Sequence, residues 1–521
     1  MSLPTWKLCA SLGLALLATS AGHAQDGAVP SVKDTWPTYN GDYSGRRYSQ
    51  LKQIDRTNVG RLALAWAFPT RGATLKGTPL VLDGVLYLTA PDHVWALDAA
   101  TGHQIWTLNR PSVGNKLSNR GVAYLKGKLY FGTPDAHLLC LDARSGKQLW
   151  DVQVADSSLS YYLAVAPLIV HDRVLIGTSG DGADIPHFLE ALDPDTGKTI
   201  WRFDSVPKPG EPGSETWSDP KVMAHGGGGM WLTGTYDPAL NLVYWGTGNP
   251  HPALDGLDRK GANLYTNTIL AIDPDTGKLV WHYQPMPHDT HDWDAVETPV
   301  LFDTDIAGKP RKLLAQASRN GYFFVLDRTT GQHIVTTQFT PESWASGLDT
   351  RGQPVSGVNL EPQPQGTLTQ GSANGGTNWM PPSYDPETRL FYVSAQQGYS
   401  FWYLALNEQN KPEDHQGGGA ISLTTDNMLE AIDVTTGKIQ WQRPTGKNRN
   451  TPGILTTAGH LLFTGDTSNN VIALDPADGK PLWHVPMGAG VTNGPMTYAL
   501  ANRQYVTMAV GDVLYTWTLP E

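Results

Sequence analysis

The chain has 521 residues, of which 40% are apolar and 17% charged, and its formal net charge is −11. This composition supports a sizeable buried core and excludes intrinsic disorder. The lack of any basic cluster excludes a nucleic-acid partner. By length alone the chain would form two to four domains, or one large all-β domain. The 55 glycines, 18 tryptophans and 20 tyrosines favour many short strands joined by tight turns.

Residues 1–24 have the pattern of a secretory signal peptide. Lys7 is the lone positive charge, the apolar stretch LCASLGLALLATSAG follows, and GHA at 22–24 resembles a cleavage site. Cys9 lies too early for lipid attachment, and no other segment approaches a membrane span, so we expect no membrane anchor. We therefore expect a periplasmic protein whose mature chain begins near Gln25.

Cysteine content narrows the chemistry further. Removal of the signal peptide would leave Cys140 as the only cysteine. A structural disulfide is then excluded despite export, as is a covalently attached c-type haem.

One unit recurs along the chain: an apolar strand, a turn built on Asp and Thr-Gly, and a second strand capped by Trp. In such a turn the Asp side chain bonds the turn backbone and the glycine supplies a positive φ. The seven copies are ALDAATGHQIW ending at Trp106, CLDARSGKQLW at Trp150, ALDPDTGKTIW at Trp201, AIDPDTGKLVW at Trp281, VLDRTTGQHIV at Val335, AIDVTTGKIQW at Trp441 and ALDPADGKPLW at Trp483.

The spacing of these copies predicts the architecture. The shortest separations, 44 and 42 residues, match one four-stranded propeller blade. Longer separations then contain insertions on one face. Pairing LALAWAF around Trp66 with the last strand, VLYTWTL around Trp517, would close an eighth blade and remove the open edges. We predict an all-β fold: one eight-bladed β-propeller over residues 25–521, with tryptophan-docking repeats whose indoles pack between neighbouring blades.

Residues that interrupt the repeat are the functional candidates. Gly226–Gly229 would let the backbone approach something flat or crowded, and Trp231 follows outside the repeat register. A glycine loop with a packed Trp is the structural alternative. Asn249 ends a strand in YWGTGNP, where an Asn is most often a turn former.

An acidic segment, MPHDTHDWDAVETP at 286–299, follows the Trp281 strand directly. It contains Asp289, Asp292 and Asp294. Aspartates two apart in an extended segment project to one side and suit a shared hard cation. The alternative is an acidic, solvated loop. Arg319 stands immediately before a strand in ASRNGYFFVLD, a position also common for surface ion pairs.

Together these segments resemble the quinoprotein alcohol dehydrogenases, whose prosthetic group is pyrroloquinoline quinone (PQQ). The resemblance extends over nearly the whole mature chain, from WPTYNGDYSGRRYSQLKQIDRTNVGRLALAW to the C-terminus. It implies that Asp292, in PHDTHDWDAV, is the catalytic base that removes the substrate hydroxyl proton. The cofactor contacts that it implies are Arg120 in NRGVAY, Trp231 in GGGGMW as the surface on which the quinone stacks, Arg319 in SRNG at the reactive carbonyl, and Asn378 with Trp379 in GGTNW.

The residue types agree with that cofactor. PQQ is a planar tricarboxylate, which needs an aromatic face and arginines around it. A cation on the quinone oxygens would act as a Lewis acid. The resemblance assigns Asn249, Asp292 and Asp294 to this metal, one Ca²⁺ or lanthanide ion. In the family an extra aspartate two positions after the catalytic one accompanies lanthanide use, which Asp294 matches; its alternative role is to replace a lost glutamate around calcium.

Several positions depart from the family pattern. The metal-ligand glutamate of the Gly-Ala-Glu motif falls on GADI, which makes Asp184 the ligand and places Gly182 and Ala183 at the cofactor; an ungapped alignment puts Gly182 at the ligand position instead. Lys76 replaces a glutamate and would bond a PQQ carboxylate or carbonyl. His291 replaces a tryptophan, and we expect it at the substrate entrance or as a loop histidine without a role. The vicinal cysteine pair of many relatives is missing.

Three functions are consistent with this sequence. The first is a periplasmic PQQ-dependent dehydrogenase that oxidises a small alcohol or polyol. Because the chain has no CxxCH, its electrons would pass to a separate protein, a soluble cytochrome c, or to a small mediator. The second is a non-catalytic propeller scaffold, of the kind seen in outer-membrane assembly lipoproteins. The third is a degenerate quinoprotein that binds PQQ weakly. Fold cannot decide among them, because function depends on the site.

Overall fold

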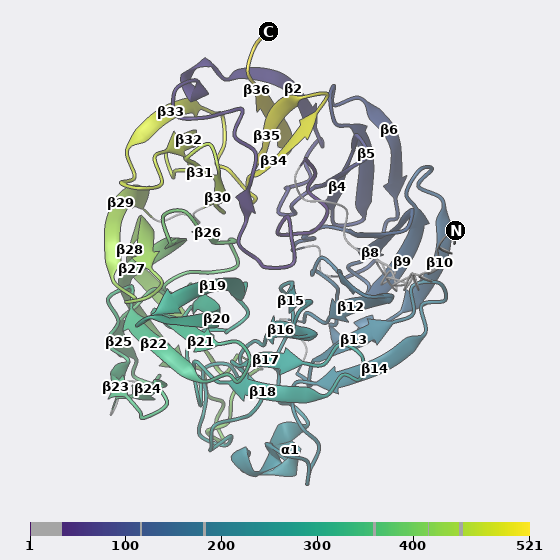
Figure 1. Ribbon diagram of the computed structural model, residues 1–521. Coiled ribbons are helices and arrows are strands. Elements are labelled where there is room, and N and C mark those ends of the chain that lie inside the picture. The colour runs from purple at the N-terminus through teal and green to yellow at the C-terminus, as the bar shows by residue number, and fades with distance from the viewer. Residues whose placement is uncertain (2–33, 115–116, 181–183, 358–360, 415, 448–451) are drawn as a thin grey trace.

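A computed structural model describes residue 1 and residues 34–114, 117–180, 184–357, 361–414, 416–447 and 452–521. The predicted signal peptide therefore lies outside the described residues. Within them the strands form nine sheets, and the larger sheets stand around a common centre in a propeller-type, all-β fold (Figure 1).

The larger sheets follow one another along the chain. Those of the first half are built from β3 (Leu80–Leu82), β4 (Val85–Ala90), β5 (His93–Asp98), β6 (Gln104–Asn109); β7 (Ala123–Leu125), β8 (Lys128–Gly132), β9 (His137–Asp142), β10 (Gln148–Gln153); β11 (Leu168–Val170), β12 (Arg173–Gly177), β13 (Phe188–Leu192), β14 (Thr199–Asp204); and β15 (Thr235–Asp237), β16 (Leu242–Gly246), β17 (Ile269–Ile272), β18 (Leu279–Tyr283).

The second half continues the pattern. Its sheets are built from β19 (Val300–Ile306), β20 (Lys309–Ala317), β21 (Tyr322–Asp327), β22 (His333–Gln338); β25 (Thr367–Gln370), β26 (Ser383–Asp385), β27 (Leu390–Leu404), β28 (Gly418–Asp433), β29 (Ile439–Lys447); β1 (Tyr48–Ser49), β30 (Leu455–Thr457), β31 (Leu461–Gly465), β32 (Asn470–Leu474), β33 (Pro481–Pro486); and β34 (Met496–Leu500), β35 (Arg503–Val510), β36 (Val513–Thr518), β2 (Ala63–Pro69).

Smaller elements complete the chain. They are a separate hairpin of β23 (Ala345–Leu348) and β24 (Pro354–Ser356), the one-turn helix α1 (Pro220–Met223), and the 3₁₀ turns η1 (Val59–Arg61), η2 (Ser157–Leu159) and η3 (Ser214–Thr216). No helix in the described part of the chain is long and apolar enough to cross a membrane.

The predicted pairing of the two chain ends is confirmed. Strand β2 pairs antiparallel with β36, with Leu64 opposite Trp517 and Trp66 opposite Thr516. The N-terminal and C-terminal segments thereby complete one sheet.

The predicted turn chemistry is also confirmed. In the turn between β5 and β6, Asp98 Oδ1 accepts from the backbone N–H groups of Ala100 and Thr101 and from the Thr101 hydroxyl. Gly102 closes that turn at φ +73°. Such a φ is open to glycine at no steric cost.

Trp66 and five of the repeated tryptophans each donate a hydrogen bond to the following repeat. Trp106 Nε1 donates to the carbonyl of Ala143 at 3.0 Å, and a Cβ on Gly146 would lie 2.6 Å from the Trp106 ring. The same indole-to-carbonyl bond reaches the next repeat from Trp66, Trp150, Trp201, Trp281 and Trp441.

Strand alternation separates the loops into two faces. Because neighbouring strands are antiparallel, the loops that enter a sheet's first strand lie on the same face as those between its second and third strands. The repeated Asp–Gly turns join third and fourth strands and lie on the opposite face. The residues that interrupt the repeat therefore fall on one face, and the repeated turns on the other.

A segment near the N-terminus crosses the centre of the molecule (Figure 1). Its carbonyls at Tyr43, Ser44 and Arg46 accept backbone bonds from β15, from the chain at the start of β19, and from β26. Arg47 is 1% exposed, and its guanidinium donates to the carbonyls of Tyr39, Ile454 and Pro495. This buried arginine ties the segment to the inner strands.

Candidate functional site

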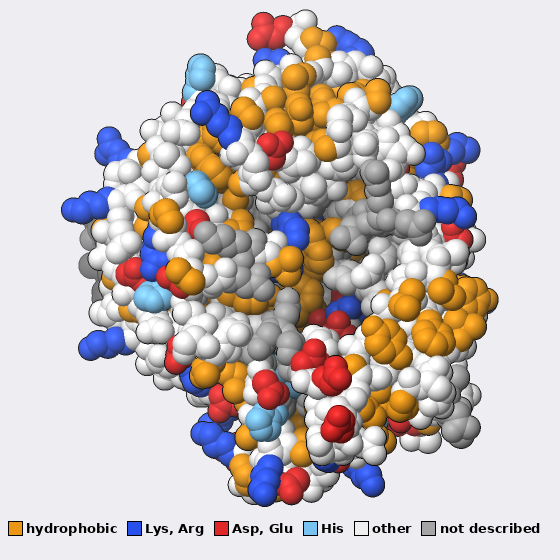
Figure 2. All heavy atoms as spheres, turned by 180° about the vertical axis from the view of Figure 1, so that it is seen from behind, with side chains coloured by type: hydrophobic (Ala, Val, Ile, Leu, Met, Phe, Trp, Pro, Cys, Tyr) orange, Lys and Arg blue, Asp and Glu red, His pale blue; other side chains and the backbone are white. Residues whose placement is uncertain are grey.

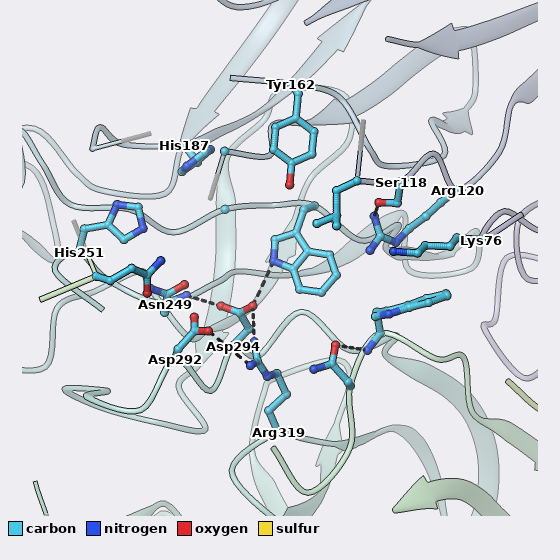
Figure 3. A pocket seen from close by; sticks show the side chains of 17 residues that line it. Lys76, Ser118, Arg120, Tyr162, His187, Asn249, His251, Asp292, Asp294 and Arg319 are labelled. Atoms are coloured by element: carbon cyan, nitrogen blue, oxygen red, sulfur yellow. Dashed lines mark hydrogen bonds and ion pairs between the residues drawn. The ribbon is translucent and has the colours of Figure 1, made fainter. Parts of the chain in front are cut away.

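The face that carries the residues interrupting the repeat contains a cavity of about 230 Å³ (Figure 3). Every residue that lines it comes from a loop into a first strand or a loop between second and third strands, as strand alternation requires. The lining residues are Lys76, Leu117, Ser118, Arg120, Tyr162, Gly180, His187, Gly229, Trp231, Asn249, His251, Asp292, Asp294, Arg319, Asn378, Trp379 and Gln416.

Cations and indoles form one side of this cavity. The Arg120 guanidinium lies 4.8 Å from the Trp231 ring centroid and 5.4 Å from that of Trp379, and it donates to Ser118 Oγ at 3.1 Å. Burial and the nearby Arg120 charge lower the pKa of Lys76. Two like charges held this close favour an anion between them.

Asp294 connects this side of the cavity to the acidic side. Its Oδ1 accepts from the backbone N–H of Asn249 at 2.6 Å, and Oδ2 accepts from Trp231 Nε1 at 3.1 Å. A Cβ on Gly248 would lie only 2.8 Å from Asp294 Oδ1. Glycine at 248 thus permits the close approach, and Asp294 fixes the plane of the Trp231 indole.

Arg319 lies between the two aspartates. Its side chain is 8% exposed; Nη1 is 2.9 Å from Asp294 Oδ2, and Nη2 is 3.5 Å from Asp292 Oδ2. Nε donates to the carbonyl of Asn374. Burial by itself would lower the pKa of Arg319, but the carboxylates of Asp292, Asp294 and Glu297 outweigh it and raise that pKa. The guanidinium therefore stays charged at the cavity wall.

Asp292 is the more accessible carboxylate. Its side chain is 41% exposed, whereas that of Asp294 is 5% exposed. The backbone at Asp292 has φ +57°, in the left-handed region that non-glycine residues seldom adopt. This turn directs the carboxylate into the cavity beside Asn249 (Figure 3).

Not all predicted residues lie at the cavity. Asp184 is half exposed, pairs with His225 at 2.8 Å, and lines a neighbouring hollow instead. Gly182 and Ala183 lie outside the described residues. Asn378 does line the cavity, but its Oδ1 accepts from the Trp379 backbone N–H at 2.8 Å.

His291 does not line the cavity. It is 3% exposed and stacks on Trp293, with ring centroids 4.5 Å apart. Its ring also meets Trp402 edge-on, with centroids 4.9 Å apart, so these two indoles bury it away from the cavity in which we expected it at the substrate entrance.

Two histidines in the cavity wall were missed from the sequence. His187 and His251 both line the cavity, and His251 is the nearer of the two to Asn249 (Figure 3). His187 Nδ1 is 3.1 Å from the Thr178 hydroxyl, and burial lowers the pKa of His187 to about 3. Both residues occupy loops of the cavity face, which is the only signal in the sequence that would have singled them out.

A pair of half-buried indoles, two cations and an Arg–Asp pair on one face of a propeller-type fold are the features expected of a quinoprotein dehydrogenase. A family model described as "Glucose/ethanol/alcohol dehydrogenase, beta-propeller domain" matches residues 36–359, and one for the outer membrane protein assembly factor BamB matches residues 341–518. The chain belongs to the family of PQQ-dependent alcohol dehydrogenases.

Individual relatives agree. The quinohemoprotein alcohol dehydrogenase of Comamonas testosteroni is 36% identical over 97% of this chain and 78% of its own length. The 1-butanol dehydrogenase (cytochrome c) of Thauera butanivorans is 34% identical over 91% of this chain and 74% of its own. A solved europium-containing methanol dehydrogenase superposes with a TM-score of 0.85 at 30% identity, over 94% of this chain and 98% of that one.

Proposed function

We propose that this protein oxidises a small alcohol or polyol to the carbonyl compound with PQQ as its cofactor. The observation that carries the proposal is the buried Arg319 between Asp292 and Asp294. The same cavity also contains two indoles and the neighbouring cations Lys76 and Arg120. A propeller that served only as a scaffold would have no need for these charges at the base of a central cavity.

The cavity suits a flat polyanion. Lys76 and Arg120 would bind carboxylates, and the indoles of Trp231 and Trp379 offer flat apolar surfaces. Asn378 orients Trp379 through the backbone bond described above. When bound, the quinone supplies a carbonyl carbon that accepts hydride. Arg319 would hold the oxygen of that carbonyl, because a buried guanidinium stabilises charge that develops on it.

Asp292 is the base in this scheme. It is the accessible carboxylate of the cavity, and it would accept the proton of the substrate hydroxyl. Its pairing with Arg319 favours the ionised form, which is the form that a base requires.

The metal would be a hard cation held by Asn249, Asp292 and Asp294, whose oxygens suit Ca²⁺ or a lanthanide ion. Among the described residues no three His, Cys, Asp or Glu side chains converge closely enough to hold a metal alone. The protein would therefore supply part of the coordination shell and the cofactor the rest. Asp184 is no longer a candidate ligand in this proposal, since it faces the neighbouring hollow.

The wider setting follows from the sequence. We infer that the chain is exported to the periplasm by residues 1–24 and that residues 25–521 form one eight-bladed propeller, closed by β2 and β36 and held by docked tryptophans. Its electrons would pass to a soluble cytochrome c, because Cys140 is the one cysteine outside the predicted signal peptide and no haem attachment motif occurs.

Titration with PQQ and a metal tests the proposal. Purified protein freed of metal would receive PQQ with Ca²⁺ or with La³⁺, and Trp fluorescence and melting temperature would be recorded. Binding should quench fluorescence through Trp231 and raise the melting temperature by ligand linkage. No response with either metal would exclude the dehydrogenase and leave the scaffold.

The identity of the metal requires a second experiment. Dye-linked alcohol oxidation would be compared between Ca²⁺ and La³⁺, in wild-type protein and in Asp294→Ala. A trivalent ion gains more from an added carboxylate than a divalent ion does, so activity with La³⁺ should depend on Asp294. Full activity with Ca²⁺ alone, unchanged in Asp294→Ala, would show that Asp294 is a bystander in the reaction.

A further inference from the structure

An apolar sheet face stands exposed beside the cavity. Strands β25, β27 and β28 extend beyond the propeller, with Leu368 opposite Phe401 and Phe401 opposite Ile421, so these three side chains share one face. Alternation along β27 adds Tyr399 and Tyr403 to it. Leu368 and Ile421 are 56% and 54% exposed.

The size of this face distinguishes it from ordinary surface. Leu423, 55% exposed, follows Ile421 where the register shifts, so six apolar side chains form the apolar face: Leu368, Tyr399, Phe401, Tyr403, Ile421 and Leu423. Figure 2 shows hydrophobic side chains gathered over this region, to one side of the central hollow. Scattered surface leucines need no explanation, but a contiguous apolar patch indicates a binding surface.

The same hairpin reaches the cavity. The loop between β27 and β28 carries Gln416, which lines the cavity, and the Gln416 carbonyl accepts from the backbone N–H of Leu254 at 2.8 Å. On the inner side of the hairpin, Trp402 packs edge-on against Trp293, with centroids 5.7 Å apart. Trp293 adjoins Asp292 in the chain. A molecule docked on the hairpin would thus stand at the opening of the catalytic cavity.

The loop that joins the two strands is acidic. It borders a hollow that shares His251 with the cavity, and five carboxylates line this acidic hollow: Asp184, Asp255, Asp258, Glu413 and Asp414. Arg259, which lines the hollow, is fully buried, and Lys411 beside it pairs with Asp258. Acidic side chains are visible beside the central hollow in Figure 2. The negative charge of the acidic hollow favours a basic partner.

We propose that the apolar face and the acidic hollow together form the docking surface for a basic electron-carrier protein. The inference rests on the proposed dehydrogenase function. Oxidation of one alcohol to its carbonyl compound releases two electrons and two protons. Two oxidised one-electron haem proteins would each take one electron in turn, and the protons would leave to solvent. Because electron transfer slows steeply with distance, the carrier must dock beside the cavity.

A small apolar patch suits this kind of occupant. Transient redox complexes have the smallest interfaces among specific complexes, below roughly 1,200 Å² of total buried surface. A patch of six apolar side chains with a charged rim is sufficient for such a partner. An apolar centre supplies most of the affinity, and charges at the rim steer the encounter.

The test compares two acceptors in the PQQ- and metal-loaded enzyme. One is a small redox dye; the other is a basic mono-haem cytochrome c. The first variant is Ile421→Ser with Leu423→Ser, and its matched control is Leu149→Ser with Ile200→Ser, which removes exposed apolar side chains from β10 and β14. We expect kcat/KM for the cytochrome to fall about tenfold in the first variant alone, within the span usual for association rates in mutants of one interface. Dye-linked rates should be unchanged.

A second pair of variants tests the charge. Asp258→Asn with Glu413→Gln removes charge from the hollow, whereas Asp172→Asn with Asp195→Asn removes two exposed, lysine-paired carboxylates from the opposite face. The first pair should lower the rate of cytochrome reduction and weaken its dependence on salt. The reason is that exposed charges at the edge of an interface attract the partner, and salt screens that attraction. The second should do neither.

Direct binding separates this inference from the proposed function. Calorimetric titration of oxidised basic cytochrome c into the protein at low salt needs no turnover. Binding that the Ile421/Leu423 variant weakens supports docking even if dye-linked activity is absent, an absence that would refute the dehydrogenase instead. Equal binding and equal cytochrome reduction in all variants would overturn the docking surface. Self-association that the same variant abolishes would show that a second copy of this chain occupies the face.

Discussion

The Asp292 carboxylate is accessible from the cavity and held in a fixed position, so its replacement should slow alcohol oxidation strongly. Asp292→Asn keeps the shape of the side chain but cannot accept the substrate proton. Loss of a general base lowers rates by roughly 10²–10⁴, so we expect dye-linked kcat to fall within that range. Asp303→Asn, which removes another aspartate paired with a buried arginine, is the matched control. PQQ affinity must be measured alongside, and unchanged turnover would refute the assignment.

Arg319 should act through its geometry as well as its charge. Arg319→Lys keeps the positive charge but loses the planar fork that contacts Asp292 and Asp294 simultaneously. We expect a lower kcat with PQQ still bound, as judged by fluorescence quenching. A wild-type rate would mean that one charge at this point is enough and that the two-aspartate geometry plays no part.

His187 should make the protein sensitive to acid. Its pKa in the folded protein is about 3, against an ordinary value of 6.5, because burial disfavours the charged ring. Between those two pH values the unfolded chain binds a proton that the folded protein does not. Stability should therefore fall as the pH drops from 6.5 towards 3 and be unaffected above 6.5. His187→Gln should flatten this slope in urea titrations at pH 4.5 to 7.5; identical slopes would contradict the buried neutral ring.

Single residues show where sequence reasoning succeeds and where it fails. Trp231, Asn249, Asp292, Asp294 and Arg319 interrupt the repeat, and each was found from that interruption. His187 and His251 have no such mark, because their place in the wall depends on packing between loops of different sheets. Asp184 follows the family motif, yet its side chain turns to His225, which the motif alone cannot reveal.

At the scale of the element, the repeated turn is the unit whose structure the sequence predicts best. Gly146 has φ +71°, and a Cβ there would lie 2.6 Å from the Trp106 ring. Gly127 has φ +83° with nothing within 4 Å of the Cβ position. Both alanine variants pay about 1–2 kcal/mol for the left-handed backbone. Gly146→Ala should lose about 1–3 kcal/mol more through overpacking, as measured by urea unfolding. Equal losses of stability in the two variants would mean that the Trp106 ring moves aside at no energetic cost.

The repeat did not predict the other elements. The spacing predicted insertions but not their form: β27 and β28 extend to 15 and 16 residues, and β23 with β24 makes a separate hairpin. The β23–β24 hairpin and the loop that joins β27 to β28 lie outside the repeated sequence, although β28 itself ends at Asp433 in a repeated turn. Their strands are stabilised by each other and by contacts such as Trp402 on Trp293, which connect residues about a hundred positions apart.

At the scale of the molecule, the fold depends on contacts between distant parts of the chain. The ring closes where β2 meets β36, and the segment around Arg47 ties the inner strands together at the centre. The array of repeated sheets is expected to close, since an open one would leave apolar edges in water. That reasoning predicted the closing pair of strands from the two chain ends. The central segment has no repeat, so its path was beyond prediction.

Closure should depend on the buried side of the closing pair of strands. Leu514 in β36 is fully buried opposite Phe68, whereas Leu64 in β2 is 54% exposed. Leu514→Ala should cost about 2–5 kcal/mol, because it removes buried methyl groups and leaves a cavity. Leu64→Ala should cost less than about 0.5 kcal/mol. Since β36 is the strand partner of β2 in their sheet, Leu514→Ala should also speed hydrogen exchange at the β2 amides while β8 and β12 remain protected. Uniform loss of protection in every sheet would mean that the ring opens as a whole rather than at this pair of strands.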